Sequence, residues 1–220
     1  MPDVFTSDNI ALKIYRHSGF TTTICSSIAA TGTDVRDLAW DDTDMYSENA
    51  GVHRLYRHST FSATLRTSIA APANSPLGLS HDNTRLFSAA NAADKIYQHC
   101  GFSTSISQSM ASPSATPAGV ANTGGNIYSM DLASLKIYYH SAFTTTIRNS
   151  FATPSSTPSG LSHDSVDIFS ADSASDKIYR HQGFSATISQ SIASPSTEPR
   201  GVTSQTVVAA VTFIPKAIMF

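Results

Sequence analysis

The sequence contains one eight-residue motif five times at a constant spacing. Its first copy is KIYRHSGF at residues 13–20, and its tyrosine, histidine and phenylalanine return every 41 residues with no insertion or deletion. The repeated residues are Tyr15, His17, Phe20, Tyr56, His58, Phe61, Tyr97, His99, Phe102, Tyr138, His140, Phe143, Tyr179, His181 and Phe184. A fixed period of this length is typical of repeat architectures, in which one small unit is copied and stacked on its neighbours.

Each repeat is predicted to form four short β-strands. In the fifth repeat the strands are expected at residues 158–164, 167–172, 177–181 and 185–192, separated by turns rich in Pro, Gly, Ser and Asp. No stretch shows the 3.6-residue period of an amphipathic helix. Four short strands in a repeat of about this length are typical of one blade of a β-propeller, so the fold class is predicted to be all-β.

Prolines and glycines mark the connections between the repeats. Two prolines and one glycine recur every 41 residues: Pro72, Pro113, Pro154, Pro195; Pro76, Pro117, Pro158, Pro199; Gly78, Gly119, Gly160, Gly201. Proline cannot donate to a sheet ladder, which places these pairs between blades. The first connection departs from the pattern, because Thr31, Val35 and Asp37 stand where the other repeats have Pro, Pro and Gly.

The two ends of the chain determine the predicted number of blades. Residues 4–6 match the second strand of a repeat, and residues 201–204 match the missing first strand. We therefore predict a single propeller over residues 1–206, with five blades closed by a C-terminal strand that completes the first blade. Residues 207–220 continue the register without the motif, as a degenerate partial repeat or an apolar tail. Six blades, the last incomplete, is the alternative.

Charge and composition exclude several partners. The formal net charge is −2, with 14 basic and 16 acidic residues among 220, which argues against a nucleic acid or an anionic membrane surface. No run of 18 apolar residues is present, and residues 1–12 lack the pattern of a secretory signal. The expected location is cytoplasmic or virion-associated. Cys25 and Cys100 differ in repeat position, so both are expected to be free thiols.

The fifth repeat resembles the NHL repeat. The resemblance is carried by Pro158-Ser159-Gly160-Leu161, by residues 168–172 (IFSAD) and by residues 176–179 (DKIY). The serine-rich form of the repeat looks like repeat proteins predicted in marine phages and environmental bacteria. The resemblance implies a propeller that serves as a binding platform; a minority of related propellers are metal-dependent hydrolases or lyases. NHL-type propellers usually have six blades, so five would depart from the family pattern.

Repeated polar residues favour structural roles. The five histidines share a strand face with the motif tyrosines, and they could form a ring of ligands or a pH sensor. Strict recurrence favours packing between blades instead, since a catalytic site needs different residues that converge. Asp8, Asp131 and Asp172, with Asn49 at the same repeat position, are expected to cap the turn before the third strand.

Candidate ligand-binding residues lie where the repeats differ. They are Trp40, His81, Asp82, Tyr139, His163 and Asp164. Hydroxyl and amide groups beside an aromatic face suit a sugar, and copies on several blades would add avidity. A metal site would need three or four convergent ligands, and the occupants of this repeat position are uneven, so neither a metal nor another cofactor is expected. No catalytic motif is present.

The sequence therefore predicts a non-enzymatic recognition module, with a glycan or another protein as its partner. A structural component of a larger assembly, such as a phage particle, is the first alternative; oligomerisation would then use residues 207–220. A metal-dependent hydrolase or lyase on a propeller scaffold, using His81, His163 and nearby carboxylates, is the second alternative.

Overall fold

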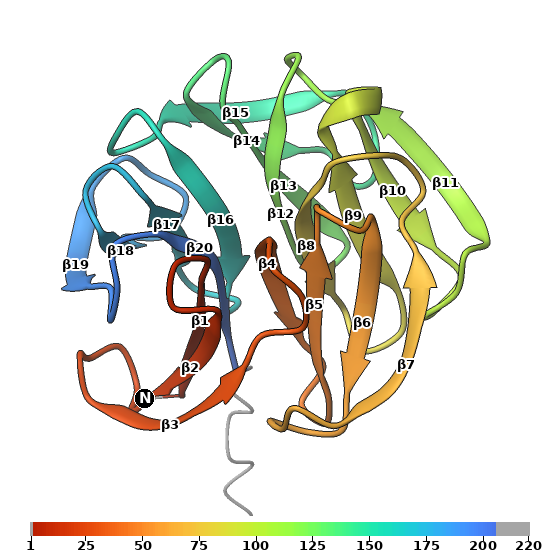
Figure 1. The fold of residues 1–220 in the computed structure, drawn as a ribbon. Coiled ribbons are helices and arrows are strands. Elements are labelled where there is room, and N and C mark those ends of the chain that lie inside the picture. Colours follow the sequence, from red (N-terminus) through yellow and green to blue (C-terminus); the bar gives the residue numbers. More distant parts are fainter. Residues whose placement is uncertain (1, 206–220) are drawn as a thin grey trace, which may run out of the picture.

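The computed structural model describes residues 2–205, which form five four-stranded antiparallel sheets arranged in a ring (Figure 1). Blade A contains, from the centre outwards, β20 (Pro199–Ser204), β1 (Val4–Asp8), β2 (Lys13–His17) and β3 (Ile24–Ala29). Blade B contains β4 (Val35–Trp40), β5 (Met45–Asn49), β6 (Arg54–His58) and β7 (Leu65–Ala70). Blade C contains β8 (Pro76–His81), β9 (Leu86–Ala90), β10 (Lys95–His99) and β11 (Ile106–Ala111). Blade D contains β12 (Pro117–Thr123), β13 (Asn126–Asp131), β14 (Lys136–His140) and β15 (Ile147–Ala152). Blade E contains β16 (Pro158–His163), β17 (Ile168–Asp172), β18 (Lys177–His181) and β19 (Ile188–Ala193).

The prediction of a five-bladed all-β propeller is confirmed. β20 pairs antiparallel with β1, with Val4 opposite Ser204 and Thr6 opposite Val202, so the last described strand completes the first blade. Residues 207–220, predicted as a partial repeat or tail, lie outside the described residues. Within residues 2–205 the one helix is the short 3₁₀ turn Asn91–Ala93, and none could span a membrane.

One strand boundary was wrong. The fourth strand of the fifth repeat was expected from residue 185, but β19 begins at Ile188. Ser185 belongs to the preceding turn, where its carbonyl lies 3.1 Å from His181 Nδ1 and its hydroxyl donates to Gln182 O at 2.8 Å. The alternation of Ser/Thr with Ile therefore starts inside a hydrogen-bonded turn.

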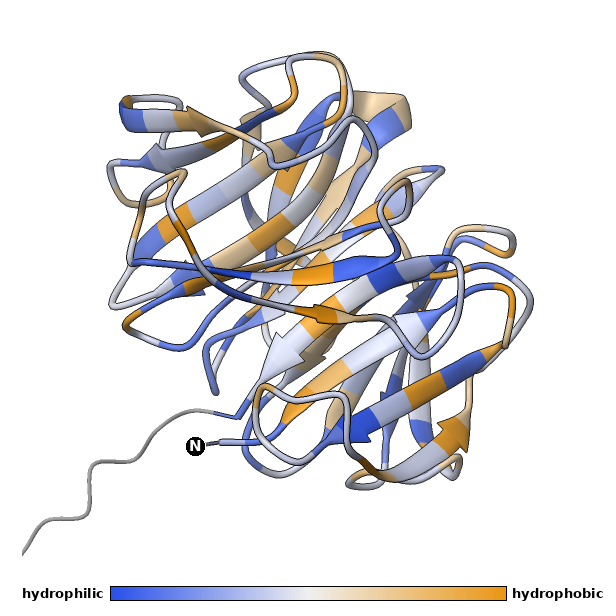
Figure 2. Ribbon diagram, turned by 90° about the vertical axis from the view of Figure 1, so that its left-hand side faces the viewer, coloured by the Kyte–Doolittle hydropathy of each residue, from blue (hydrophilic) through white to orange (hydrophobic). Residues whose placement is uncertain are grey.

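Aromatic side chains join each blade to the next. Apolar and polar residues alternate along the strands (Figure 2), and the apolar ones face the neighbouring blades. The motif phenylalanine of each blade packs on an aromatic ring in the second strand of the preceding blade, with centroids 5.2 to 6.0 Å apart. The five contacts are Phe61 on Phe5, Phe102 on Tyr46, Phe143 on Phe87, Phe184 on Tyr128 and Phe20 on Phe169. This contact explains why the phenylalanine recurs in every repeat.

The five motif histidines are fully buried and hydrogen-bonded in the same way. In His181, Nδ1–H donates to the carbonyl of Ser185, because a carbonyl can only accept, and Nε2 then accepts from the Ser170 hydroxyl at 3.0 Å. The same pair of bonds recurs at His17, His58, His99 and His140. Each ring thus ties its strand to the second strand of its own blade and to the following turn.

The turn before the third strand is capped as the sequence predicts. The side chains of Asp8, Asn49, Asp131 and Asp172 each accept a hydrogen bond from the backbone N–H three residues later, at 2.8 to 3.2 Å. In blade C the equivalent residue is Ala90, which cannot accept such a bond. There the chain forms its 3₁₀ turn instead.

The repeat glycines allow the inner strands to approach closely. A Cβ on Gly160 would lie 2.4 Å from the carbonyl oxygen of Arg200, in the neighbouring blade. Blade B has Asp37 at this position, and its buried carboxylate accepts hydrogen bonds from Leu38 N–H at 2.9 Å and Leu79 N–H at 3.0 Å. Blade B is therefore the one blade with a side chain at this repeat position, and there the carboxylate accepts hydrogen bonds from backbone N–H groups of blades B and C.

A second buried acid lies near Asp37. Glu48 is fully buried, and among residues 2–205 neither of its carboxylate oxygens has a hydrogen-bond partner. Burial raises the pKa of Glu48 well above its usual range, and Arg36 offsets only part of this effect. Burial also raises the pKa of Asp37, and the neighbouring Glu48 adds to that rise. The ionised form of Glu48 is therefore unfavourable in the folded protein.

Replacing Glu48 by methionine, the residue at this repeat position in blade D, is expected to stabilise the protein by about 1–4 kcal/mol at pH 8. Because the folded pKa lies above the unfolded value of about 4.3, the penalty is absent below that pH and grows as the pH rises. The measurement is the free energy of unfolding in urea, at pH 8 and pH 4.5, for both proteins. Glu48→Gln, which keeps the shape but does not titrate, should remove the pH-dependent part alone. A loss of stability in Glu48→Met at pH 8 would contradict this account.

Candidate functional site

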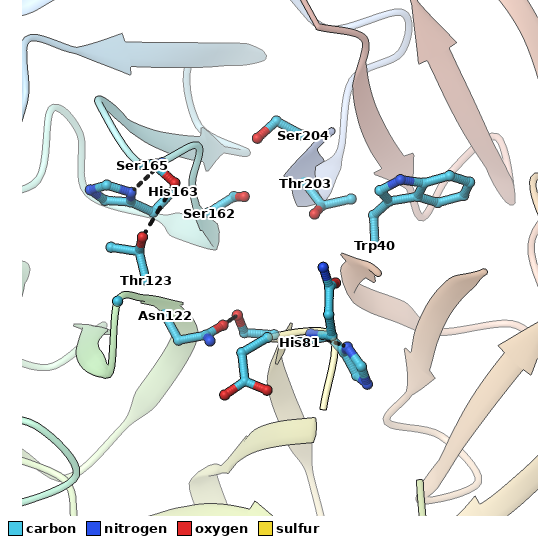
Figure 3. A pocket seen from close by; sticks show the side chains of 13 residues that line it. Trp40, His81, Asn122, Thr123, Ser162, His163, Ser165, Thr203 and Ser204 are labelled. Carbon is cyan, nitrogen blue, oxygen red and sulfur yellow. Dashed lines mark hydrogen bonds between the residues drawn. The ribbon is translucent and has the colours of Figure 1, made fainter. Parts of the chain in front are cut away.

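A polar cavity of about 180 Å³ lies at one mouth of the ring, where the first strands of the blades end (Figure 3). Its lining residues come from all five blades. They are Trp40, Ser80, His81, Asp82, Asn83, Asn122, Thr123, Gly124, Ser162, His163, Ser165, Thr203 and Ser204. We call this cavity the channel-mouth site. Most of its polar groups are hydroxyls, side-chain amides and imidazoles.

In blades B to E the turn after the first strand holds the lining residues in place. Oδ1 of Asp82 accepts hydrogen bonds from the backbone N–H groups of Thr84 at 3.1 Å and Arg85 at 2.6 Å. Asp41 and Asp164 bind the equivalent groups of their own turns. In blade D the turn instead uses two glycines with positive φ, Gly124 and Gly125, which need no side-chain acceptor.

Three aromatic residues at the ends of first strands stack on the preceding blade. The rings of Trp40 and Phe5 lie 5.0 Å apart with an interplanar angle of 22°, and those of His81 and Tyr46 lie 4.7 Å apart at 9°. His163 stacks on Tyr128 at 4.8 Å and 17°. The side chains therefore belong both to the channel-mouth site and to the interfaces between blades.

Both imidazoles of the site are neutral at pH 7. Burial lowers the pKa of His81 and of His163, and the neighbouring carboxylates offset part of this. Nδ1 of each ring accepts a backbone hydrogen bond, from Asn83 N–H at 2.9 Å and from Ser165 N–H at 2.8 Å. The hydrogen of each neutral ring is therefore on Nε2, which leaves one donor per imidazole.

Two polar groups of the site lack a hydrogen-bond partner. The indole Nε1 of Trp40 and the hydroxyl of Ser204 are both buried and make no hydrogen bond in the described structure. In Figure 3 the nitrogen side of the indole faces Thr203 and Ser204. A buried donor without an acceptor is costly, so each of these two groups would gain from a polar hydrogen-bond partner.

The structure brings together four of the six predicted ligand-binding residues. Trp40, His81, Asp82 and His163 line the site. Tyr139 does not; it stacks on Tyr128 at 5.0 Å, with the Arg148 guanidinium over its ring. Asp164 is 5% exposed, and its carboxylate accepts a hydrogen bond from the Asp167 N–H in its own turn.

Sequence reasoning missed most of the small polar residues of the site. Ser80, Ser162 and Thr203 line it one residue before the end of each first strand. Their shared repeat position was the available signal, since 80, 162 and 203 differ by multiples of 41. Serine and threonine are common throughout this chain, so composition alone did not separate them from loop residues.

The electrostatics of the site are close to neutral. Its one carboxylate, Asp82, forms an ion pair with Arg85 at 2.7 Å. In residues 2–205 no group of three or more His, Cys, Asp or Glu side chains is arranged to hold a metal ion. His81 and His163 each stack on a separate tyrosine instead of converging. The arrangement is suited to hydrogen bonding with an uncharged polar molecule.

Comparison with known proteins supports the fold alone. No protein-family model and no curated protein sequence matches the chain. Among solved structures, a nidogen/laminin complex matches with a TM-score of 0.62 and 10% identity over 93% of this chain and 98% of that chain. Glutaminyl cyclase from Myxococcus xanthus matches at 0.58 and 13% identity, covering 88% of this chain and 83% of that one. A Bacteroides caccae protein of unknown function matches at 0.56 and 13%, covering 88% and 73%.

Proposed function

We propose that this propeller is a non-enzymatic recognition module and that its channel-mouth site binds an uncharged saccharide. The observation that carries the proposal is the pair of buried groups without partners, Trp40 Nε1 and the Ser204 hydroxyl, in a cavity lined by hydroxyls and amides. A sugar hydroxyl both donates and accepts, so one hydroxyl could accept from the indole while it bonds to Ser204. The resemblance of the repeat to the NHL pattern supports a binding platform.

Size and charge narrow the ligand class. The cavity of about 180 Å³ is smaller than the roughly 300–1,000 Å³ of sites for drug-sized ligands, which favours one sugar ring or the end of a chain. The two neutral imidazoles and the paired Asp82 offer no net charge to an ionic ligand. All five blades share this one cavity, so the proposal implies one such site per ring. Multivalent binding through separate blades stays a prediction.

The test is a glycan array followed by titration calorimetry. Selective binding to one class of uncharged sugar, with one site per chain, is the expected result. Trp40→Phe should bind about two- to tenfold more weakly, because it keeps a ring against Phe5 but loses one neutral hydrogen bond. Tyr139→Phe, outside the site, is the matched control and should bind normally. A blank array with folded protein, or equal affinities for both variants, would contradict the proposal.

A further inference from the structure

The interface between blades C and D contains a second cavity, of about 310 Å³. Its lining combines the apolar side chains of Phe87, Ile127 and Phe143 with polar groups: Arg85 and the side-chain amides of Gln98, Gln108, Asn122 and Asn126. We propose that this cavity binds a small planar nitrogen heterocycle, whose ring stacks on Phe87. This cavity shares Asp82 and Asn122 with the channel-mouth site, but the proposal does not depend on the sugar proposed there.

Three of the other four interfaces have an aromatic side chain in this place; at the interface of blades E and A the residue is Ser204, and the Arg180 guanidinium lies over Phe169. A ring from the end of the first strand covers the aromatic residue of the preceding blade at three interfaces: Trp40 covers Phe5, His81 covers Tyr46 and His163 covers Tyr128. The centroids are 4.7 to 5.0 Å apart and the rings are within 22° of parallel. The repeat therefore forms a slot that accepts an imidazole or an indole against an aromatic face.

At the interface between blades C and D no side chain places a ring there. The residue at this repeat position is Asn122, and its amide oxygen accepts a hydrogen bond from the Ser80 hydroxyl. Both Asn122 and Phe87 line the cavity. Phe87 retains its tilted contact with Phe143, at 6.0 Å.

A second difference between the blades changes the side chains around the same space. In blades A, B and E a third-strand arginine pairs with an aspartate at the start of the second strand, as in Arg57–Asp44 at 2.7 Å and Arg180–Asp167 at 2.7 Å. Blade C has Gln98 and Arg85 at these positions. Gln98 is shorter and turns to Ser107 Oγ at 2.9 Å, and Arg85 pairs with Asp82. In blades B and E a third-strand guanidinium lies over the aromatic ring. In blade C the guanidinium of Arg85 lies over Phe87 instead, 5.6 Å from the ring centroid, which leaves the other face of Phe87 for a ligand ring.

The polar groups that line the cavity indicate which class of ring it would bind. Side-chain amides donate and accept in the plane of a stacked ring, which matches a heterocycle with nitrogen atoms on its edge. Among the described residues, the charged groups on the lining are Asp82 and Arg85, which pair with each other, so an uncharged ring is favoured over an ion. The volume falls within the range of small-molecule sites and admits a fused two-ring system such as indole or adenine.

The first experiment titrates ¹⁵N-labelled full-length protein with indole and with adenine, and follows the side-chain amide signals in two-dimensional NMR spectra. We expect saturable shifts at Gln98, Gln108 and Asn122 with at least one of these rings. Methyl glucoside, a saturated ring of similar size, should leave Gln98 and Gln108 unshifted. The absence of saturable shifts with both rings would overturn the proposal.

Two variants fill the cavity between blades C and D with residues found at the same repeat positions in other blades. Asn122→His supplies the imidazole found in blades C and E, and the double variant Arg85→Asp/Gln98→Arg restores the Asp–Arg pair of blades A, B and E. Each is expected to weaken ring binding at least tenfold while the protein still melts cooperatively. Unchanged affinity in both folded variants would overturn the proposal.

A gain of binding is a further check. His163→Asn places at the interface of blades D and E the residue that blade D has at this position, Asn122. The change would remove the imidazole that stacks on Tyr128. We expect new saturable shifts near Asn149 and a stoichiometry of two rings per chain. A stoichiometry that stays at one, with Tyr139 still stacked on Tyr128, would show that an uncovered aromatic face is not what recruits the ring, and would overturn the proposal.

Discussion

A chain that ends at residue 198 is expected to lose cooperative unfolding altogether. This truncation removes β20, whose buried Val202 packs with Val4 in the core between blades A and E. The inner edge of β1 would then have unpaired backbone groups in a buried place, and the first strands β4 and β16 would each lose a neighbour. The loss exceeds what a domain with a stability of about 5–15 kcal/mol can absorb.

The measurement is a thermal melt followed by circular dichroism, together with the elution volume on size exclusion. A chain that ends at Gln205 is the matched control, because it retains every described contact of β20, including the 2.7 Å bond from Gly201 N–H to Ser7 Oγ. Adding a synthetic peptide of residues 199–205 to the shorter chain should restore part of the transition by strand addition. A cooperative melt of the 198-residue chain near the temperature of the control would refute the role given to closure.

The ring of buried histidines is expected to make the protein acid-sensitive. Burial lowers the pKa of all five, and that of His181 to about 4, with the hydrogen bonds to backbone carbonyls offsetting part of the shift. The folded pKa lies below the unfolded value of about 6.5, so the unfolded state binds more protons and stability falls as the pH drops through 6.5. His181 alone is expected to cost about 2 kcal/mol between pH 6.5 and pH 5.

Glu48 and Asp37 act in the opposite direction, because their folded pKa values are raised and the folded state gains from acidification. The cleanest measurement therefore uses the Glu48→Met variant, in which one opposing group is absent. Its melting temperature should fall between pH 8 and pH 5, by about 2–4 °C for each kcal/mol lost. His53→Gln, at an exposed position, should leave this fall unchanged. Equal melting temperatures at pH 8 and pH 5 in the Glu48→Met variant would contradict the prediction.

The candidate site was predictable only in part. Trp40 and His81 could be selected because they interrupt a regular repeat, and a departure from a repeat is visible without a structure. Tyr139 departs in the same way, but its side chain points to the interface between blades D and E. Asp164 has a carboxylate that could bind a ligand, but its Oδ1 already accepts hydrogen bonds from two backbone N–H groups of its own turn. A single sequence cannot distinguish a residue that lines the site from one that does not, since this depends on whether its side chain points into the cavity or toward a neighbouring blade.

The sequence by itself determined the period, the four strands of each blade and the closure of the ring, because local turn chemistry and strand alternation repeat without gaps. Only the tertiary structure decided at which repeat positions the side chain packs between blades and at which it lines a cavity. The stacking of His81 on Tyr46 joins residues 35 positions apart in different blades, and no local pattern encodes that contact. The cavity at Asn122 likewise exists because a neighbouring blade supplies Phe87 and no ring covers it, which is a property of two blades packed together.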